Sequence, residues 1–198
     1  MPKSDQPVLK TMQNPVLLAF GANLTSAFGS PTETITESLK ELEKSELDVR
    51  VVSRLFQTPA FPPSSGSDYV NVAALCESQL APGEILKVLH RIEEKFGRLR
   101  EHRWEARTLD IDLLAVGDQI LPNAAVHKHW RDLSPQAQAT DTPEQLILPH
   151  PRIQDRSFVL IPLVDVAPNW VHPILDLSVV EMLSRLPEAS TEGIYPKS

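Results

Sequence analysis

Two aspartates, Asp110 and Asp112, stand two residues apart in the string Thr-Leu-Asp-Ile-Asp, which follows a cluster of arginines. Side chains at positions i and i+2 of a strand point to the same face, so this spacing places both carboxylates together. Two adjacent carboxylates repel each other unless a positive charge joins them. Carboxylate oxygens are ligands for Mg²⁺, usually together with the phosphates of a substrate. The pair therefore predicts a metal site.

Four arginines stand within residues 98–107, and guanidinium groups bind phosphate oxygens bidentately. With two glutamates against them and His102 neutral, this segment has a net charge of +2 in a chain of formal charge -7. A local positive site in an acidic protein suits a small anionic ligand better than a nucleic acid. A metal site beside a cationic clamp is what a nucleoside triphosphate needs. The arginines are Arg98, Arg100, Arg103 and Arg107.

A few other residues could contact a flat, polar ligand. Tyr69 and Asn71 share one face of a predicted strand, and an amide both donates and accepts, as the edge of a heterocycle requires. Trp104 is either a core anchor or a stacking ring, and His150, between two prolines, is either a turn residue or a phosphate contact. Neither Gly-x-x-x-x-Gly-Lys nor Gly-x-Gly-x-x-Gly occurs, so phosphates would have to be held by side chains and metal.

The elements that must position these residues follow from hydrophobic periodicity and helix caps. Ser30-Pro31 with Glu33 is a typical helix start, and Gly97 suits the end of a second helix. The order indicates an α+β, ferredoxin-like antiparallel sheet with helices packed on one face. The predicted elements are a strand at 16–20, a helix from 31, a strand at 48–57, a strand at 69–78, a helix at 82–96 and a strand at 108–116.

The length of 198 residues suits a single domain, predicted over 15–187 with a polar insertion at about 123–145. Residues 1–14 are expected to form a flexible tail and 188–198 a C-terminal tail, while Arg156 and Phe158 stand at strand spacing. Cys76 is the only cysteine, which excludes an intrachain disulfide, and its apolar surroundings predict core packing. With no apolar run of membrane length and no signal-peptide pattern, the expected location is cytoplasmic.

Several short strings stand in a fixed order along residues 15–175: Gly21-Ala22-Asn23-Leu24, Ser53-x-x-Phe56-x-Thr58-Pro59, Asp68-Tyr69-x-Asn71, Arg91-Ile92-Glu93, Gly97-Arg98, Arg103-Trp104-x-x-Arg107-Thr108-Leu109-Asp110-Ile111-Asp112-Leu113, Pro149-His150-Pro151 and Arg156-x-Phe158-Val159-Leu160. In this combination the chain resembles the 6-hydroxymethyl-7,8-dihydropterin pyrophosphokinase family of folate biosynthesis. The resemblance implies transfer of the pyrophosphoryl group of ATP to the hydroxymethyl oxygen of the pterin, with release of AMP.

The resemblance also implies a role for each matched residue. Asp110 and Asp112 would hold two Mg²⁺ ions, and Arg98 and Arg107 would engage the triphosphate. The other residues matched to the nucleotide site are Glu93, Arg100, Trp104, Ile111, His150 and Arg156. Those matched to the pterin pocket are Thr58, Pro59, Phe61, Tyr69, Asn71, Trp104 and Phe158, with Trp104 and Phe158 on the two sides of the ring.

The chain departs from the family pattern at Ala22, at His90 and at Glu105-Ala106, the last of which could change how a loop closes. One alternative is an Asp-x-Asp metal-dependent phosphohydrolase or nucleotidyltransferase on a similar fold. A second is a catalytically silent nucleotide- or RNA-binding module, which the acidic charge and the lack of an aromatic strand motif disfavour. The expected partners are small molecules, with no nucleic acid or membrane, and the protein is expected to be a monomer.

Overall fold

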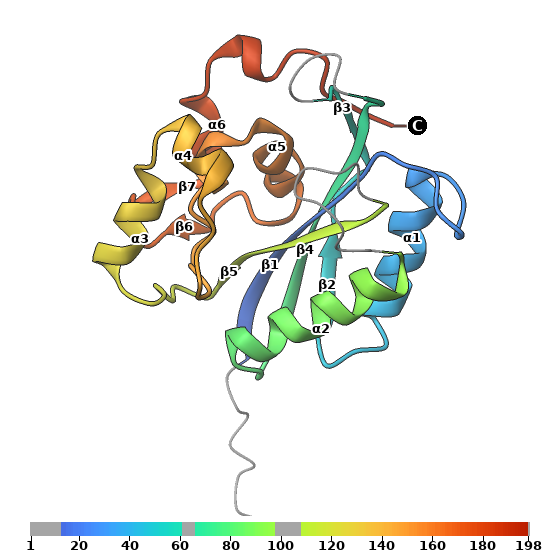
Figure 1. Ribbon diagram of the computed structural model, residues 1–198, viewed down its shortest axis with the longest axis horizontal. Helices are drawn as coiled ribbons and strands as arrows, with labels where there is room; N and C mark the ends of the chain where they lie inside the picture. The colour runs from blue at the N-terminus through green and yellow to red at the C-terminus, as the bar shows by residue number, and fades with distance from the viewer. Residues whose placement is uncertain (1–12, 61–65, 98–107, 198) are drawn as a thin grey trace, which may run out of the picture.

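The computed structural model describes residues 13–60, 66–97 and 108–197, which form an antiparallel sheet and a set of helices (Figure 1). The strands are β1 (Asn14–Ala22), β2 (Asp48–Val52), β3 (Phe56–Thr58), β4 (Tyr69–Ser78), β5 (Asp110–Val116), β6 (Val171–His172), β7 (Leu177–Ser178) and β8 (Tyr195–Pro196). The helices are α1 (Pro31–Leu42), α2 (Pro82–Lys95), α3 (Ala124–Arg131), α4 (Pro135–Thr140), α5 (Ser157–Val166) and α6 (Val179–Ser184), with short 3-10 turns η1 (Ile153–Asp155) and η2 (Glu188–Ser190).

The main sheet runs in the order β5-β1-β4-β3-β8, and β2 pairs with β4 beside β3. Every pairing in it is antiparallel, and β1 is an interior strand between β4 and β5. This confirms the predicted α+β class, the central strand and the chain order of the ferredoxin-like pattern. The predicted single strand at 48–57 is two strands, because Ser53 bonds to Ala73 through both its backbone and its hydroxyl and so bends the chain between them.

The two expected helix starts and the glycine stop are confirmed. Ser30 accepts from the Glu33 backbone N–H, and the Glu33 carboxylate accepts from Ser30, which is a capping box at the start of α1. Gly97 ends α2 with a φ of 91°, a left-handed conformation that a side chain disfavours. Thr108 then donates its hydroxyl to the Phe96 carbonyl, which fixes the start of the next strand against the end of the helix.

One face of the sheet is a continuous apolar core under α1 and α2. Alternate residues of the central strands point into it, as the two-residue period predicts, and Cys76 lies among them with no exposed surface. Burial raises the pKa of the Cys76 thiol to about 12, so this residue packs as an apolar group. The strand residues of this core include Val16, Leu18, Phe20, Val72, Ala74, Ile111 and Leu113.

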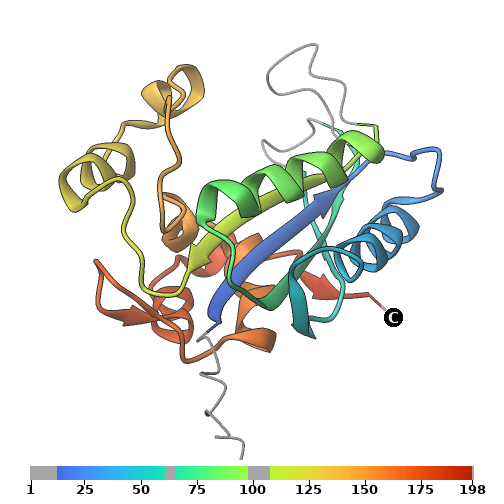
Figure 2. The ribbon, with the colours of Figure 1, turned by 90° about the horizontal axis from the view of Figure 1, so that it is seen from below.

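The opposite face is covered in part by α5 and α6, which corrects two expectations (Figure 2). Helices lie on both sides of the sheet, not on one, and Arg156 and Phe158 stand at the start of a helix and not on a strand. The stretch from Phe158 to Val166 is apolar at almost every position. It therefore shows neither the 3.6-residue period of a helix nor the two-residue period of a strand. The helix packs against both the sheet and α6 and has no fully exposed residue, which explains that composition.

The ends of the chain also differ from the expectation. Asn14 was placed in the N-terminal tail, but it begins β1 and pairs with Ser78. In the expected C-terminal tail, β8 pairs with β3, and Lys197 N–H donates to the Leu55 carbonyl, because the short β3 leaves its outer edge open to a partner. Within 123–145 the chain forms α3 and α4, which stand beyond the end of β5 in Figure 2.

The 14 residues of α2 are fewer than the ~20 that a bilayer requires, and no other helix in the described ranges could span a membrane.

Candidate functional site

A row of residues across the sheet brings the predicted metal and ligand residues to one face. Asp110 of β5 is opposite Gly21 of β1, Gly21 is opposite Asn71 of β4, and Asn71 is opposite Phe56 of β3. Directly opposed residues of antiparallel strands point to the same face. Asp112 lies two residues further along β5 and shares that face. The two carboxylates and the Asn71 amide, far apart in sequence, are therefore neighbours across one glycine.

Gly21 permits this close approach. A β carbon at position 21 would stand 3.1 Å from the Asn71 Oδ1 atom, which is tighter than an ordinary contact. Asn71 in turn donates its amide N–H to the Thr58 hydroxyl oxygen at 2.7 Å, and both side chains are buried. This bond fixes which way the amide faces, so the polar edge that Asn71 and Thr58 present has a defined order of donor and acceptor.

The remaining described residues of the predicted pterin pocket surround that pair. Tyr69 is opposite Thr58 in the β3–β4 register and is partly exposed, while Pro59 follows β3 and is exposed. Phe158, in the first turn of α5, is partly buried against the core of that face, and the Arg156 guanidinium carbon lies 5.7 Å from its ring centre. A flat ligand resting beside Asn71 would therefore meet both polar and aromatic groups.

A turn that begins at Pro149, together with the start of α5 that follows it, places His150 and Arg156 beside the aspartates. His150 donates its backbone N–H to the Leu114 carbonyl at 2.7 Å, two residues beyond Asp112 on the same strand. Arg156 Nη1 lies 3.4 Å from Asp112 Oδ2 and supplies the positive charge that the carboxylate pair requires. The structure thus brings together Asp110, Asp112, His150 and Arg156, as the resemblance implies.

The imidazole of His150 has a defined protonation state. Arg152 donates its backbone N–H to His150 Nδ1 at 3.1 Å, so the ring proton is on Nε2 and is available to donate. Burial and the positive charge of Arg156 hold the pKa of His150 well below its usual range, although Asp110 acts in the opposite direction. A neutral histidine that donates from Nε2 is suited to a phosphate oxygen and adds no repulsion against the arginines.

Glu93 and Ile111 were expected at the nucleotide, and the structure places both behind the aspartate strand. Glu93 is fully buried on α2, and its Oε1 accepts from the Ile111 backbone N–H at 2.9 Å. The Ile111 side chain points into the core under α1 and α2, away from the aspartate face. These two residues therefore fix the edge of β5 between Asp110 and Asp112.

The donor chemistry of the aspartate pair fits Mg²⁺. This ion keeps several water molecules and binds one or two protein carboxylates together with substrate phosphates. Within the described part of the chain, no group of three or more histidine, cysteine or acidic side chains could hold a metal ion by itself. Two carboxylates with a triphosphate are enough for Mg²⁺, whereas zinc would require more protein ligands. The residues that fit the metal are Asp110 and Asp112.

The loops expected to complete the site lie outside the described residues. They carry Phe61, Arg98, Arg100, Arg103, Trp104 and Arg107, whose assignments stay predictions. Two further residues were not anticipated from the sequence, namely Arg152, which orients His150, and His127, which contacts the same turn. The position of Arg152 directly after Pro149-His150-Pro151 was the one available signal.

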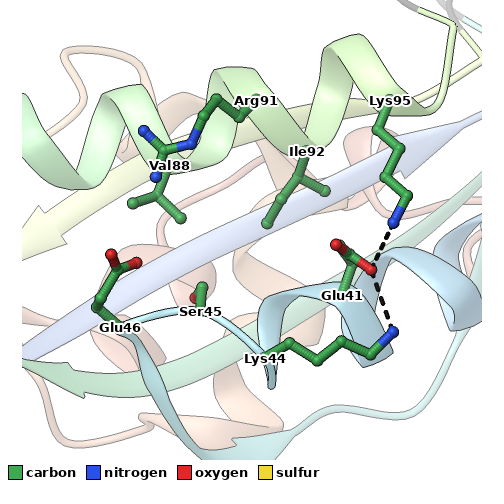
Figure 3. Close-up of a pocket in the computed structure, with 8 residues that line it drawn as sticks. All are labelled: Glu41, Lys44, Ser45, Glu46, Val88, Arg91, Ile92 and Lys95. Carbon is green, nitrogen blue, oxygen red and sulfur yellow. Dashed lines mark hydrogen bonds and ion pairs between the residues drawn. The ribbon is translucent and has the colours of Figure 1, made fainter.

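A hollow of about 210 Å³ lies on the side of the sheet that α1 and α2 cover (Figure 3). Its charged groups are already paired in part, because Glu41 forms ion pairs with both Lys44 and Lys95. It does not include any residue of the aspartate face. It is lined by Glu41, Lys44, Ser45, Glu46, Val88, Arg91, Ile92 and Lys95.

Comparisons with known proteins agree with this geometry. Residues 17–168 match the family model described as 7,8-dihydro-6-hydroxymethylpterin-pyrophosphokinase. A 2-amino-4-hydroxy-6-hydroxymethyldihydropteridine pyrophosphokinase of Pseudomonas aeruginosa is 34% identical over 182 residues, covering 88% of this chain and 98% of that protein. The enzyme of the same name from Haemophilus influenzae is 32% identical over 157 residues, covering 79% and 83%.

Other relatives are longer than this chain. A Synechocystis pyrophosphokinase is 34% identical over 140 residues, which is 71% of this chain but 61% of that protein. A Plasmodium falciparum HPPK-DHPS crystal structure superposes with a TM-score of 0.63 at 16% identity, covering 90% of this chain and 46% of that one. At that identity the superposition shows the fold alone. The chain belongs to the 7,8-dihydro-6-hydroxymethylpterin-pyrophosphokinase family, the enzymes that transfer the pyrophosphoryl group of ATP to hydroxymethyldihydropterin in folate synthesis.

Proposed function

We propose that this chain transfers the β,γ-pyrophosphoryl group of ATP to the hydroxymethyl oxygen of 6-hydroxymethyl-7,8-dihydropterin, giving the pterin diphosphate and AMP. The observation that carries the proposal is the row from Asp110 through Gly21 to Asn71. The row brings the Asp110 carboxylate, which suits a metal–phosphate group, close to the oriented Asn71 amide, which suits a heterocycle. The reaction requires these two ligands to lie side by side.

The nucleotide half of the site is assigned to the β5 side. Asp110 and Asp112 are the ligands for two Mg²⁺ ions, which when bound neutralise phosphate charge. The Arg156 guanidinium lies 3.4 Å from Asp112. His150 is bonded through its backbone to Leu114 of the same strand, so both residues are assigned to this half. Arg98, Arg100 and Arg107 are assigned to the triphosphate by the family pattern. Glu93 and Ile111 hold the strand from behind and do not themselves reach the nucleotide through their side chains.

The pterin half is assigned to the β3–β4 side. Asn71 and Thr58 present an ordered donor–acceptor edge to the pterin ring, and Tyr69 and Pro59 border it. Phe158 covers one side of the ring, and Trp104 and Phe61 are assigned to the pocket by the family pattern. Gly21 separates the two halves, so its lack of a side chain lets the pterin oxygen approach the phosphate group.

The chemical step is an in-line displacement at the β phosphorus. The hydroxymethyl O–H releases its proton to water, a bond forms from that oxygen to the β phosphorus, and the bond from the β phosphorus to the α–β bridging oxygen breaks. AMP leaves with that oxygen. The side chains contribute by position and charge, because Arg156 and the neutral His150 stabilise negative charge without forming covalent bonds.

The proposal extends to the organisation of the chain. The pyrophosphokinase domain is the expected 15–187 extended to Asn14 and to β8, which both pair in the main sheet. Residues 123–145 are an insertion in it, and the protein acts as a monomer. A cytoplasmic location follows from the use of ATP as a substrate. Gel filtration with light scattering tests the oligomeric state directly.

The decisive experiment is an AMP-release assay with ATP, Mg²⁺ and 6-hydroxymethyl-7,8-dihydropterin, run with and without the pterin. AMP that appears only with pterin, in equal amount to pterin diphosphate, supports the transfer. Release of ADP or pyrophosphate that ignores the pterin would overturn it in favour of an Asp-x-Asp phosphohydrolase or nucleotidyltransferase. A parallel titration with EDTA should stop the reaction, and added Mg²⁺ should restore it.

A further inference from the structure

The inserted helix α3 is bonded to the turn that presents His150. His127 is fully buried on α3, and its Nε2 lies 2.9 Å from the Pro149 carbonyl oxygen. A carbonyl only accepts, so Nε2 carries the ring proton and donates it to Pro149. The residue that receives this bond is the immediate neighbour of His150. A helix outside the sheet therefore makes direct contact with the turn at the nucleotide half of the site.

A second set of bonds joins the same two segments in the opposite direction. Arg152, on the turn, donates from Nη1 to the Arg131 carbonyl at 2.6 Å and from Nη2 to the Trp130 carbonyl at 2.9 Å. These carbonyls belong to the last turn of α3, where a helix leaves them without partners and where positive charge is favourable. The Arg152 side chain is 12% exposed, so these bonds are shielded from water. The turn and α3 are thus bonded to each other at the middle of the helix and at its C-terminal end.

The ring of His127 is also held from behind. His172 of β6 packs edge-on against it, with ring centres 5.8 Å apart. His172 Nδ1 accepts from the Ile174 and Leu175 backbone N–H groups, which fixes its own orientation. Trp170 also packs against His172, with ring centres 5.7 Å apart, and donates its indole N–H to the Gly117 carbonyl, just beyond β5. The His127 ring therefore has little room to rotate away from Pro149.

We propose that His127 is a positioning residue for the nucleotide half of the site, which it supports by fixing the Pro149–His150 turn from α3. The proposal rests on the proposed function, since it assumes that His150 contacts the phosphates of ATP. It assigns a role to the insertion, which contributes no residue to the row of Asp110, Gly21 and Asn71. The pterin half should be independent of it, because Asn71 and Thr58 are held by β3 and β4.

Two substitutions of His127 test the proposal, because both introduce a side-chain amide but the two side chains differ in length by one carbon. His127→Gln places an amide N–H near the position of Nε2 and should keep the bond to Pro149. His127→Asn carries the same amide one carbon shorter and should lose the bond while staying polar. Because a buried carbonyl is then left without its donor, we expect His127→Asn to raise the KM for ATP about tenfold and His127→Gln to change it less than about threefold. The KM for the pterin should stay unchanged in both.

A matched control and a direct binding measurement complete the test. His129→Asn changes the same residue type on the exposed face of α3 and should behave as the unchanged protein. Calorimetry with a non-hydrolysable ATP analogue should show the same tenfold loss for His127→Asn, with pterin affinity retained. Equal losses for ATP and pterin, or an ATP affinity that is normal in His127→Asn, would overturn the positioning role. Failure of the proposed function would show differently, as an unchanged protein that releases no AMP with pterin.

Discussion

The two ends of the sheet face that carries α5 are built from the same three strands and have opposite chemistry. At the covered end, Leu17 of β1, Ala73 of β4 and Leu114 of β5 are buried in one cluster with Leu160 and Leu163 of α5. Here the sheet face is a second hydrophobic core. Burial of apolar area is what this end contributes, at about 25 cal/mol per Å².

At the open end, before α5 begins, the same strands present Gly21, Asn71 and Asp110 in one row. Only a few residues separate the two ends on each strand. The start of α5 divides the apolar part of this face from the polar part. The face is apolar where the helix covers it and polar where the helix has not begun. Arg156 and Phe158, at the start of α5, lie at the boundary between the two ends.

The largest expected effect comes from removing one charge at the open end. Asp112→Asn keeps the shape of the side chain but removes the proposed metal ligand and the partner of Arg156, so turnover should fall by about 10³-fold or more. The free energy of unfolding should change little, because Asp112 is partly exposed and adds nothing to the apolar cluster. AMP release and urea denaturation measure the two quantities. Normal turnover in this variant would contradict the metal assignment.

The reverse result, a loss of stability with a normal KM for ATP, is expected at Leu114, two residues beyond Asp112 on β5. Leu114→Ala removes a fully buried side chain at the covered end and should lower the free energy of unfolding by about 2–5 kcal/mol. Because the Leu114 carbonyl still accepts from His150, the KM for ATP of the folded fraction should stay close to normal. Urea denaturation and steady-state kinetics below the unfolding range provide the comparison. A large rise in KM with unchanged stability would mean that the two ends are not separable.

Beside the covered end, where Trp170 packs on His172 and His172 on His127, the buried imidazoles should be stable only in their neutral form. Burial, together with the charge of His127 and of Arg131, lowers the pKa of His172 to about 4, and burial lowers the pKa of His127 as well. In the unfolded chain a histidine has a pKa near 6.5, so as the pH falls below this value the unfolded state takes up a proton that the folded state does not. Stability is therefore full above about pH 6.5 and is lost toward pH 4.

His172→Asn isolates this contribution. The asparagine oxygen can accept from Ile174 and Leu175 in place of Nδ1, and it does not titrate. Between pH 6.5 and 4, the unchanged protein should lose up to about 3 kcal/mol more of its free energy of unfolding than this variant. Denaturant titrations at a series of pH values measure the difference, with His129→Asn as the exposed-histidine control. Identical pH profiles would show that His172 is not buried in solution.

The open end was more predictable from the sequence than the covered end. A period of two predicted that Asp110 and Asp112 face away from Ile111 and Leu113. The structure agrees, because Ile111 and Leu113 point into the core under α1 and α2 while the two aspartates stay partly exposed. Helix starts and stops were also predictable, since caps such as Ser30 with Glu33 act within a few residues. The short strings that match the family pattern then assigned distant segments to one site, which residue spacing alone could not do.

What escaped prediction depends on contacts between distant segments. A uniformly apolar stretch gives no period, so the start of α5 at Ser157 was not visible, and neither was the second covered face. The pairing of Tyr195–Pro196 with β3 involves two residues, which is too short for a pattern. His127 and Arg152 lie in polar surroundings in the sequence, and only the packing of α3 on the turn explains their burial.

The smallest expected effect comes from one added methyl group at Gly21, the middle residue of the row from Asp110 to Asn71. It is also the most specific test of the open end. Gly21→Ala would place a β carbon 3.1 Å from Asn71 Oδ1, so the amide must shift by a few tenths of an ångström. The KM for the pterin should rise about tenfold, while the KM for ATP and the free energy of unfolding change little. Gly83→Ala is the matched control, because its β carbon would meet nothing within 4 Å and should leave both constants unchanged. A rise in the KM for ATP alone would place the methyl group against the phosphates and would move the pterin away from Asn71.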